Sequence, residues 1–124
     1  MWGTEMQREA AAQTQLFEWT AWARGRYPAL NLLFHIPNGG SRDRREAFHL
    51  KQQGVKAGVP DLFLPVARGG FHGLFIELKV KGNRPSEEQK KWIADLNAEG
   101  YRAVVCFGFD EARATIEGYL GIRG

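Results

Sequence analysis

The spacing of apolar residues along the chain changes between the period of a helix and the period of a strand. Between residues 5 and 25, apolar side chains recur at helical spacing, at Ala12, Leu16, Trp19 and Ala23. Gly25 and Pro28 are expected to end this helix. The segment 32–36 is then predicted to be a short apolar strand, stopped by the turn signal Pro-Asn-Gly-Gly at 37–40.

A basic segment and an apolar hairpin follow. Ser41 is the expected N-cap of a helix that runs to about Gln53, with Gly54 at its C-terminal end. After a Gly/Pro loop over 54–60, the segments 61–66 and 74–80 are predicted strands. The connection between them contains Arg68-Gly69-Gly70, and its length fits a hairpin.

The last third of the chain is predicted to hold two helices and one strand. Ser86 and Gln89 have the spacing of a capping box, which opens a helix to about Glu99. The segment 101–107 is an apolar strand, and Asp110 is the expected cap of a final helix to about Leu120. The order α-β-α-β-β-α-β-α predicts an α/β fold in which helices flank a small mixed β-sheet.

Composition limits the class of protein. The 124 residues fit one domain, spanning 1–124, with a single core. Cys106 is the only cysteine, so the sequence excludes a disulfide framework and we expect a reducing, cytoplasmic location. No apolar run approaches the length of a membrane span, and the N-terminus lacks a signal-peptide pattern. A membrane partner is therefore not expected.

The positive charge is concentrated in one segment. The whole chain carries a net charge of +3, and residues 42–56 alone carry the same excess. The basic residues of this segment are Arg42, Arg44, Arg45, Lys51 and Lys56. This distribution indicates an anionic partner.

Three charged residues lie within the predicted apolar hairpin. Asp61 opens its first strand, and Glu77 and Lys79 share one face of the second. Such charges are costly in apolar surroundings unless they are paired or bound to a metal ion. Together they form a small acidic metal site beside a cation, an arrangement that suits hydrolysis of a phosphodiester. The alternative is an ordinary ion pair between Glu77 and Lys79.

An Asp after Pro, followed one strand later by Glu-x-Lys, resembles the PD-(D/E)xK nuclease superfamily. The flanking segments are more specific and look like its VRR-NUC branch, in the short stand-alone form of bacteria and phages. These segments are 35–40, 54–64, 76–79, and Ser86 with Gln89. The resemblance extends from about Glu9 to Leu120. It implies a restriction-endonuclease-like fold and a metal-dependent DNA endonuclease, in a bacterium or a phage-infected host.

The resemblance also implies roles for the residues of the hairpin. Asp61 and Glu77 would ligate Mg²⁺ or Mn²⁺, because such hard cations prefer carboxylate oxygens, and the carbonyl of Leu78 would be a further ligand. Lys79 would orient the attacking water or stabilise charge in the transition state. A role for Lys79 as a base stays open.

The resemblance implies a further acid on the first helix, where Glu5, Glu9 and Glu18 are the candidates. Glu9 shares the helix face of Gln13 and Leu16, whereas Glu18 lies nearly opposite. The family's pattern of a Glu followed four residues later by Gln also matches Glu9. We therefore choose Glu9 as a catalytic and metal-binding residue. The alternative is a first-turn acid that the helix dipole favours.

A functional role and a structural role are both open for two polar residues, Gln89 and His35. Gln89 shares a helix face with Ile93 and Leu96, from which it could reach Lys79 or the scissile phosphate. It could instead be used locally in the capping box. His35 precedes the Asn38-Gly39-Gly40 loop on an apolar strand, and a structural role is favoured over a role as a ligand.

The DNA-binding surface is expected at the loop and the basic helix. Asn38, Gly39 and Gly40 form a loop whose backbone can approach a phosphate closely, although turn formation alone would explain them. Arg42, Arg44, Arg45, Lys51 and Lys56 are expected to contact the DNA backbone. A solvated helix face is the alternative.

The substrate and the assembly have several readings. Branched DNA such as a Holliday junction is favoured over plain duplex. Two symmetric cuts need two active sites, which a C₂ homodimer supplies, and Trp22 is a candidate for its interface. A nuclease of broad specificity, or one that cuts flaps or ends, is the alternative. A non-catalytic DNA-binding module on the same scaffold is a further one.

Overall fold

The computed structural model describes residues 4–37 and 43–122. The predictions for Asn38, Gly39, Gly40 and Arg42 lie outside these residues. The elements are α1 (Glu5–Ala23), the 3₁₀ helix η1 (Pro28–Leu32), β1 (Phe34–His35), α2 (Arg44–Gln52), β2 (Leu62–Leu64), β3 (Leu74–Lys79), α3 (Glu87–Ala98), β4 (Arg102–Phe107) and α4 (Phe109–Leu120). Apart from η1, their order is the predicted one.

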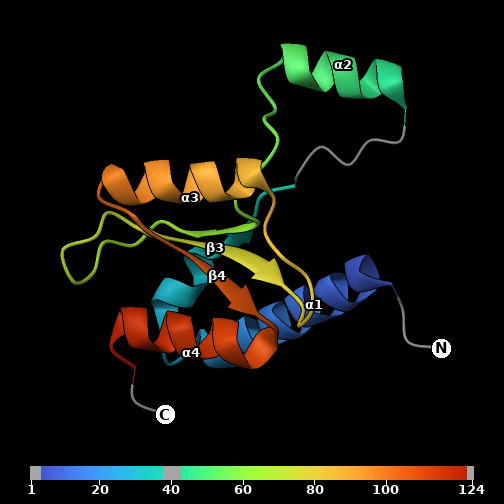
Figure 1. The fold of residues 1–124 in the computed structure, drawn as a ribbon. Helices are drawn as coiled ribbons and strands as arrows, with labels where there is room; N and C mark the ends of the chain where they lie inside the picture. Colours follow the sequence, from blue (N-terminus) through green and yellow to red (C-terminus); the bar gives the residue numbers. More distant parts are fainter. Residues whose placement is uncertain (1–3, 38–42, 123–124) are drawn as a thin grey trace.

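The four strands form one mixed sheet in the order β1-β2-β3-β4. β2 and β3 pair antiparallel as the predicted hairpin. β3 and β4 pair in parallel, which requires the crossover that α3 provides. Figure 1 shows α3 on one face of the sheet and α1 with α4 on the other. The predicted α/β class with a small mixed sheet is therefore confirmed.

The apolar core lies between the sheet and the α1–α4 layer. Ile76 and Leu78 point from β3 into it and are almost fully buried, as are Leu16 of α1 and Ile116 of α4. Glu77 and Lys79 alternate with these core residues in β3. The strand is thus buried on both faces, and its two charged side chains lie on the side of α3.

Three local predictions were wrong in detail. The N-cap of α2 is Asp43, whose side chain accepts a hydrogen bond from the N–H of Arg45, and not Ser41. The helix α4 begins directly after Gly108, at φ 89°, so Asp110 lies within its first turn and is not its cap. The strand predicted at 32–36 is reduced to Phe34–His35, because the residues before it form η1.

Other predictions hold closely. The capping box of α3 is present, since Ser86 accepts from the N–H of Gln89 while Gln89 accepts from the N–H of Ser86. Trp19 is buried in the core as expected.

Cys106 is buried, and its thiol donates to the hydroxyl of Thr115 over 3.4 Å. No helix in the described parts of the chain has the length and apolar character needed to cross a membrane.

Candidate active site

The register of the hairpin brings the two predicted metal-binding acids together. Leu62 pairs with Ile76 across the antiparallel strands. One residue further along, this register sets Asp61 opposite Glu77, so that their side chains can approach each other. One carboxylate oxygen of Asp61, Oδ2, accepts a hydrogen bond from the backbone N–H of Leu78 over 2.9 Å. Asp61 is therefore fixed to the strand that carries Glu77.

Glu77 is only 2% exposed and lies at the centre of a small polar cluster. Its Oε2 accepts from Nε2 of Gln89 at 3.1 Å and lies 3.5 Å from Nζ of Lys79. Its Oε1 is buried and has no hydrogen-bond partner among the described residues. A buried carboxylate oxygen without a partner is costly, so this atom indicates a group that is bound during function.

The environment of Glu77 disfavours its ionised form. Burial, followed by the negative charge of Asp61, raises the pKa of Glu77 from 4.5 to about 8, and Lys79 opposes this shift. Two acids face one lysine in a buried space, so with both acids ionised the site would hold one more negative charge than Lys79 balances. A positive ion near both carboxylates would relieve this excess.

Gln89 makes the predicted capping contact and, through another atom, a contact that was not predicted. Its Oε1 accepts from the N–H of Ser86 over 2.8 Å, which completes the capping box. Its Nε2 donates to Glu77 across to β3. The partner is Glu77 and not Lys79. One side chain therefore fixes the start of α3 to the acidic cluster.

Asp61 and the loop before it are held by hydrogen bonds on two sides. The carbonyl oxygen of Asp61 accepts from the N–H of Ile36 at 2.6 Å and from Nδ1 of His35 at 2.9 Å. His35 thus contacts the backbone at the start of β2, in line with the structural role favoured from the sequence. On the other side, the indole N–H of Trp92 in α3 donates to the carbonyl of Ala57.

Gly58 makes the second of these contacts possible. It adopts φ +89°, and a Cβ atom at this position would lie 2.8 Å from the backbone carbonyl carbon of Glu88 in α3. Any side chain here would push the loop away from the helix. A glycine is therefore required for the loop to bring Asp61 beside Glu77.

Glu9 is half-buried in α1. Its Oε2 accepts from Nδ2 of Asn83 over 2.8 Å, and Asn83 lies in the loop that connects β3 to α3. Sequence reasoning missed Asn83, because nothing in a local pattern reports a contact across 74 positions. The contact fastens the loop that follows the charged strand onto α1.

The donor set fits a divalent cation with an open coordination shell. The described residues contain no group of three or more His, Cys, Asp or Glu side chains arranged to hold a metal ion. Mg²⁺ usually takes one or two carboxylates, and waters and substrate phosphate complete its shell. Asp61 and Glu77, with the unpartnered Oε1, match that requirement. Leu78, the third predicted ligand, lies between Glu77 and Lys79 and is buried.

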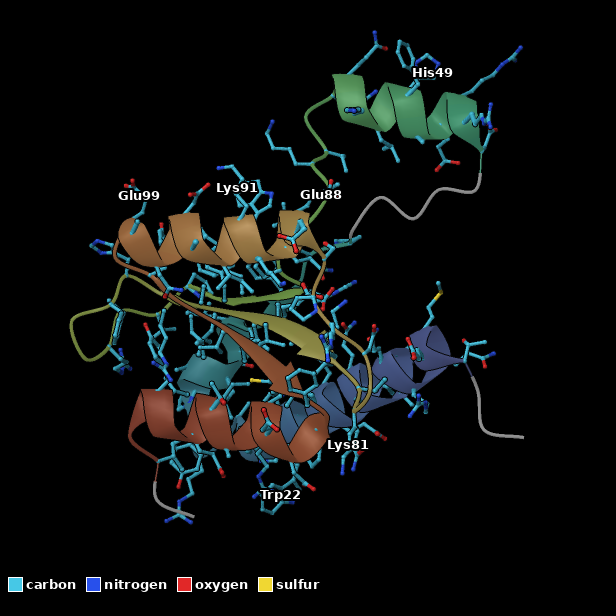
Figure 2. All side chains as sticks on the ribbon, viewed as in Figure 1. Trp22, His49, Lys81, Glu88, Lys91 and Glu99 are labelled. Carbon is cyan, nitrogen blue, oxygen red and sulfur yellow. The ribbon has the colours of Figure 1, made fainter. Side chains whose placement is uncertain are left out.

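The basic residues lie elsewhere on the molecule. Figure 1 shows α2 standing apart from the sheet, and the helix buries none of its residues. Arg44, Arg45, Lys51 and Lys56 are all exposed on or just after it. Lys51 and Lys56 border a hollow of about 500 Å³ between α2 and the start of α3. Trp22 is 81% exposed, on the side of the molecule away from α3 (Figure 2).

Comparison with known proteins agrees with this geometry. The family model of the VRR-NUC domain matches residues 7–110. A solved structure described as a VRR_NUC domain protein is 35% identical to this chain and superposes with a TM-score of 0.78. That match covers 98% of this chain and 93% of the other. No curated protein matches the chain. The fold is consistent with the predicted restriction-endonuclease-like architecture.

Proposed function

This chain belongs to the VRR-NUC family, a nuclease-type family, and we propose that it is a metal-dependent endonuclease that hydrolyses phosphodiester bonds in branched DNA, such as Holliday junctions. The observation that carries the proposal is the buried Oε1 of Glu77, which has no partner among the described residues. The register of the hairpin sets this carboxylate opposite Asp61. Its other oxygen, Oε2, lies 3.5 Å from Nζ of Lys79.

Asp61 and Glu77 would hold Mg²⁺ or Mn²⁺, with the carbonyl of Leu78 as a further ligand. The bound ion would supply positive charge to the scissile phosphate and the attacking water. The proposal uses the free oxygen of Glu77 for the ion. The other oxygen is already oriented by Gln89. Gln89 therefore acts as a positioning residue.

Lys79 would donate to the phosphate where negative charge develops in the transition state. Its ammonium group is held beside Glu77 and is nearly buried, since the residue is 8% exposed. Burial strengthens its interaction with an anion, because water screens it less. Glu9 would be the further catalytic and metal-binding acid, and its contact with Asn83 would fasten it to the loop at the C-terminal end of β3.

The exposed helix α2 would place its basic side chains on the DNA backbone. It stands away from the body of the protein and offers Arg44, Arg45 and Lys51 without burying any of them. Lys56 and the loop residues Asn38, Gly39, Gly40 and Arg42 complete the proposed surface. A C₂ homodimer would present two such surfaces and two active sites to one junction. The exposed Trp22 remains the candidate for its interface.

A cleavage assay tests this function directly. Purified protein is incubated with Mg²⁺, Mn²⁺ or EDTA and with labelled duplex, single-stranded, flap and four-way substrates. We expect cleavage only with the metals, and fastest on the four-way substrate. Asp61→Asn, Glu77→Gln and Lys79→Ala should each lower the rate at least about 100-fold. Lys90→Ala, an exposed lysine of α3, is the matched control and should keep full activity.

The outcomes separate the rival functions. Metal-dependent cleavage that is equal on all substrates would leave a nuclease of broad specificity and remove the junction preference. A preference for flaps would assign end or flap cutting instead. Tight DNA binding without cleavage in any metal would leave a non-catalytic DNA-binding module. Light scattering on the same samples measures whether the protein is a dimer. A monomer that cuts junctions no faster than duplex would exclude the proposed junction-cutting dimer.

A further inference from the structure

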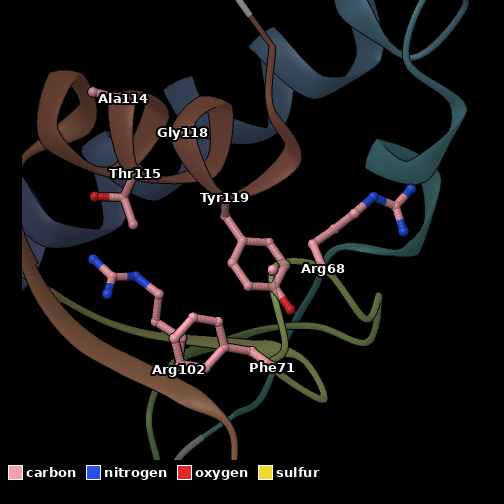
Figure 3. A pocket seen from close by; sticks show the side chains of 8 residues that line it. Arg68, Phe71, Arg102, Ala114, Thr115, Gly118 and Tyr119 are labelled. Atoms are coloured by element: carbon pink, nitrogen blue, oxygen red, sulfur yellow. The ribbon is translucent and has the colours of Figure 1, made fainter.

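A second hollow lies on the face of the sheet opposite Glu77, between the hairpin turn, the start of β4 and α4 (Figure 3). Its volume is about 370 Å³, which is within the range of small-ligand sites. We call it the arginine hollow, and the residues that define it are Arg68, Phe71, Arg102, Thr115, Gly118 and Tyr119. None of them belongs to the candidate active site.

The shape of the arginine hollow is set by local backbone geometry. Gly69 and Gly70 both have positive φ, at 57° and 89°, so the chain reverses tightly between Arg68 and Phe71. The backbone N–H of Arg68 donates to the carbonyl of Phe71, and the N–H of Phe71 donates to the carbonyl of Arg68. They are therefore held opposite each other at the rim. On α4, Gly118 has no side chain, and nothing would lie within 4 Å of a Cβ atom there.

An aromatic wall stands beside this turn. The hydroxyl of Tyr119 donates to the carbonyl of Val66 over 2.6 Å, which fixes the ring. The ring centroids of Tyr119 and Phe71 are 6.4 Å apart. Phe71 is 36% exposed, so one part of its ring is accessible to a ligand. The wall offers a planar apolar surface that is held in place.

The charge of the arginine hollow has one sign. Among the described residues, Arg68 and Arg102 are the only charged ones that line it, and neither forms an ion pair with a described residue. Arg68 donates from Nη1 to the carbonyl of Ala67 over 2.8 Å, and its other N–H groups remain for a ligand. Figure 3 shows their guanidinium groups on opposite sides of the two aromatic rings. A guanidinium binds phosphate oxygens well, and two of them without an ion-pair partner among the described residues favour an anion.

We propose that the arginine hollow binds a nucleotide unit of an unpaired DNA strand, with its base on Phe71 and the phosphates on its two sides at Arg68 and Arg102. Aromatic rings interleaved with arginines are how proteins hold unpaired strands, because every base can stack. The proposal rests on the proposed function in that DNA is the ligand. It adds a site that would hold the strand exposed at a branch.

The arginine hollow is separate from the position of the scissile phosphate. Arg102 pairs with Leu74, whereas Glu77 lies three residues further along β3, which is about 10 Å. Glu77 also faces α3, and the hollow faces α4. A strand in the hollow would therefore be bound without occupying the acidic cluster. A free nucleotide would supply the same chemistry, so the test includes both.

The test measures binding in EDTA, where cleavage is not expected. Fluorescence anisotropy follows a short labelled oligothymidylate, which has no pairing of its own, and a duplex of matched length. We expect Arg102→Gln and Arg68→Gln each to weaken oligothymidylate binding about tenfold. Phe71→Leu should weaken it about tenfold by loss of stacking. Duplex binding should change less than about twofold in all three variants.

Arg24→Gln is the matched control, because it removes the same charge from an exposed residue at the end of α1, outside the hollow. It should change binding less than about twofold. An equal loss in Arg24→Gln and Arg102→Gln would overturn the proposal, since binding would then report overall charge. An equal loss for duplex and oligothymidylate would also overturn it. Competition by thymidine monophosphate at low concentration would assign the hollow to free nucleotides instead of a strand.

A second measurement uses the unaltered protein, so it does not depend on whether a variant folds. In ¹H–¹⁵N spectra of the unaltered protein, adding oligothymidylate should shift the amide signals of Gly69, Gly70 and Gly118. Shifts confined to α2 or to β3 would overturn the proposal. The cleavage assay remains independent: a protein that never cleaves DNA but shows these shifts would lose the proposed function and keep the strand site.

Discussion

Glu77→Gln should remove a pH dependence of folding stability that the buried carboxyl group imposes. The folded state holds the pKa of Glu77 at about 8, against 4.5 in an ordinary environment. Because the folded pKa is raised, the folded state binds the proton more tightly than the unfolded chain does. This contribution to stability is complete below about pH 4.5 and is lost as the pH rises to about 8. Glutamine cannot ionise, so the variant should lack the loss.

The magnitude follows from the two pKa values of Glu77. At about 1.4 kcal/mol for each pH unit, the difference between 4.5 and about 8 gives about 5 kcal/mol over the full range. Between pH 5 and pH 8 the wild-type free energy of unfolding should fall by at most about 3–4 kcal/mol relative to the variant. This is an upper figure, because water and relaxation near a buried charge reduce such effects. Loss of the Lys79 contact lowers the variant's stability at every pH, so the slope with pH is the test.

The assay is urea unfolding followed by tryptophan fluorescence in EDTA, at pH 5, 6.5 and 8. Glu18→Gln, an exposed acid of α1, is the matched control and should keep the wild-type slope. Adding Mg²⁺ at pH 8 should restore stability to the wild type, by preferential binding to the folded state, and not to Glu77→Gln. If wild type and Glu77→Gln keep the same pH slope, the buried-carboxyl argument fails.

Further predictions concern the supporting residues and the metal. Glu9→Gln should slow cleavage at least about tenfold more than Glu18→Gln, because only Glu9 is bonded to the loop after β3; equal rates would remove its role. Ca²⁺ should permit DNA binding with little cleavage, since its looser geometry positions water and phosphate less well, and full activity in EDTA would exclude the metal mechanism. Gly58→Ala should lower the free energy of unfolding by about 1–3 kcal/mol, whereas Gly25→Ala, with open space around it, should not; equal unfolding curves would contradict the close approach. Arg44→Gln should reduce the log–log salt slope of DNA binding by about one, and an unchanged slope would place α2 off the DNA.

The helices and strands could be predicted because they depend on local patterns. The alternation in β3 and the spacing in α1 are properties of neighbouring residues, and both elements appear within two residues of their predicted limits. The capping box of α3 was also visible, since Ser86 and Gln89 are only three positions apart. The caps of α2 and α4 could not be predicted, because several polar residues lie near the start of each helix. Asp43 was preferred to Ser41, and Gly108 supplies a backbone turn that replaces a capping side chain.

In the candidate site too, the features that depend on local pattern could be predicted, and those that depend on register or packing could not. That Glu77 and Lys79 share a face followed from the strand period, and their side chains do meet. That Asp61 faces Glu77 depends on the register, which the two-glycine turn and the hairpin pairing fix together. The partner of Glu9 depends on the packing of α1 against the loop after β3. No periodicity contains that information, so sequence reasoning gave no sign of the contact between Glu9 and Asn83.

Gln89 explains why α3 belongs to the site although its residues carry no charge there. The amide has one acceptor atom and one donor group, and the structure uses the acceptor for the N–H of Ser86 and the donor for Glu77. A glutamate at this position could cap the helix but would repel Glu77, and an alanine could do neither. The start of α3 and the orientation of the carboxylate are therefore set by one side chain. Because Gly58 packs against the same turn of α3, the helix end fixes Asp61 and Glu77 relative to each other from both strands.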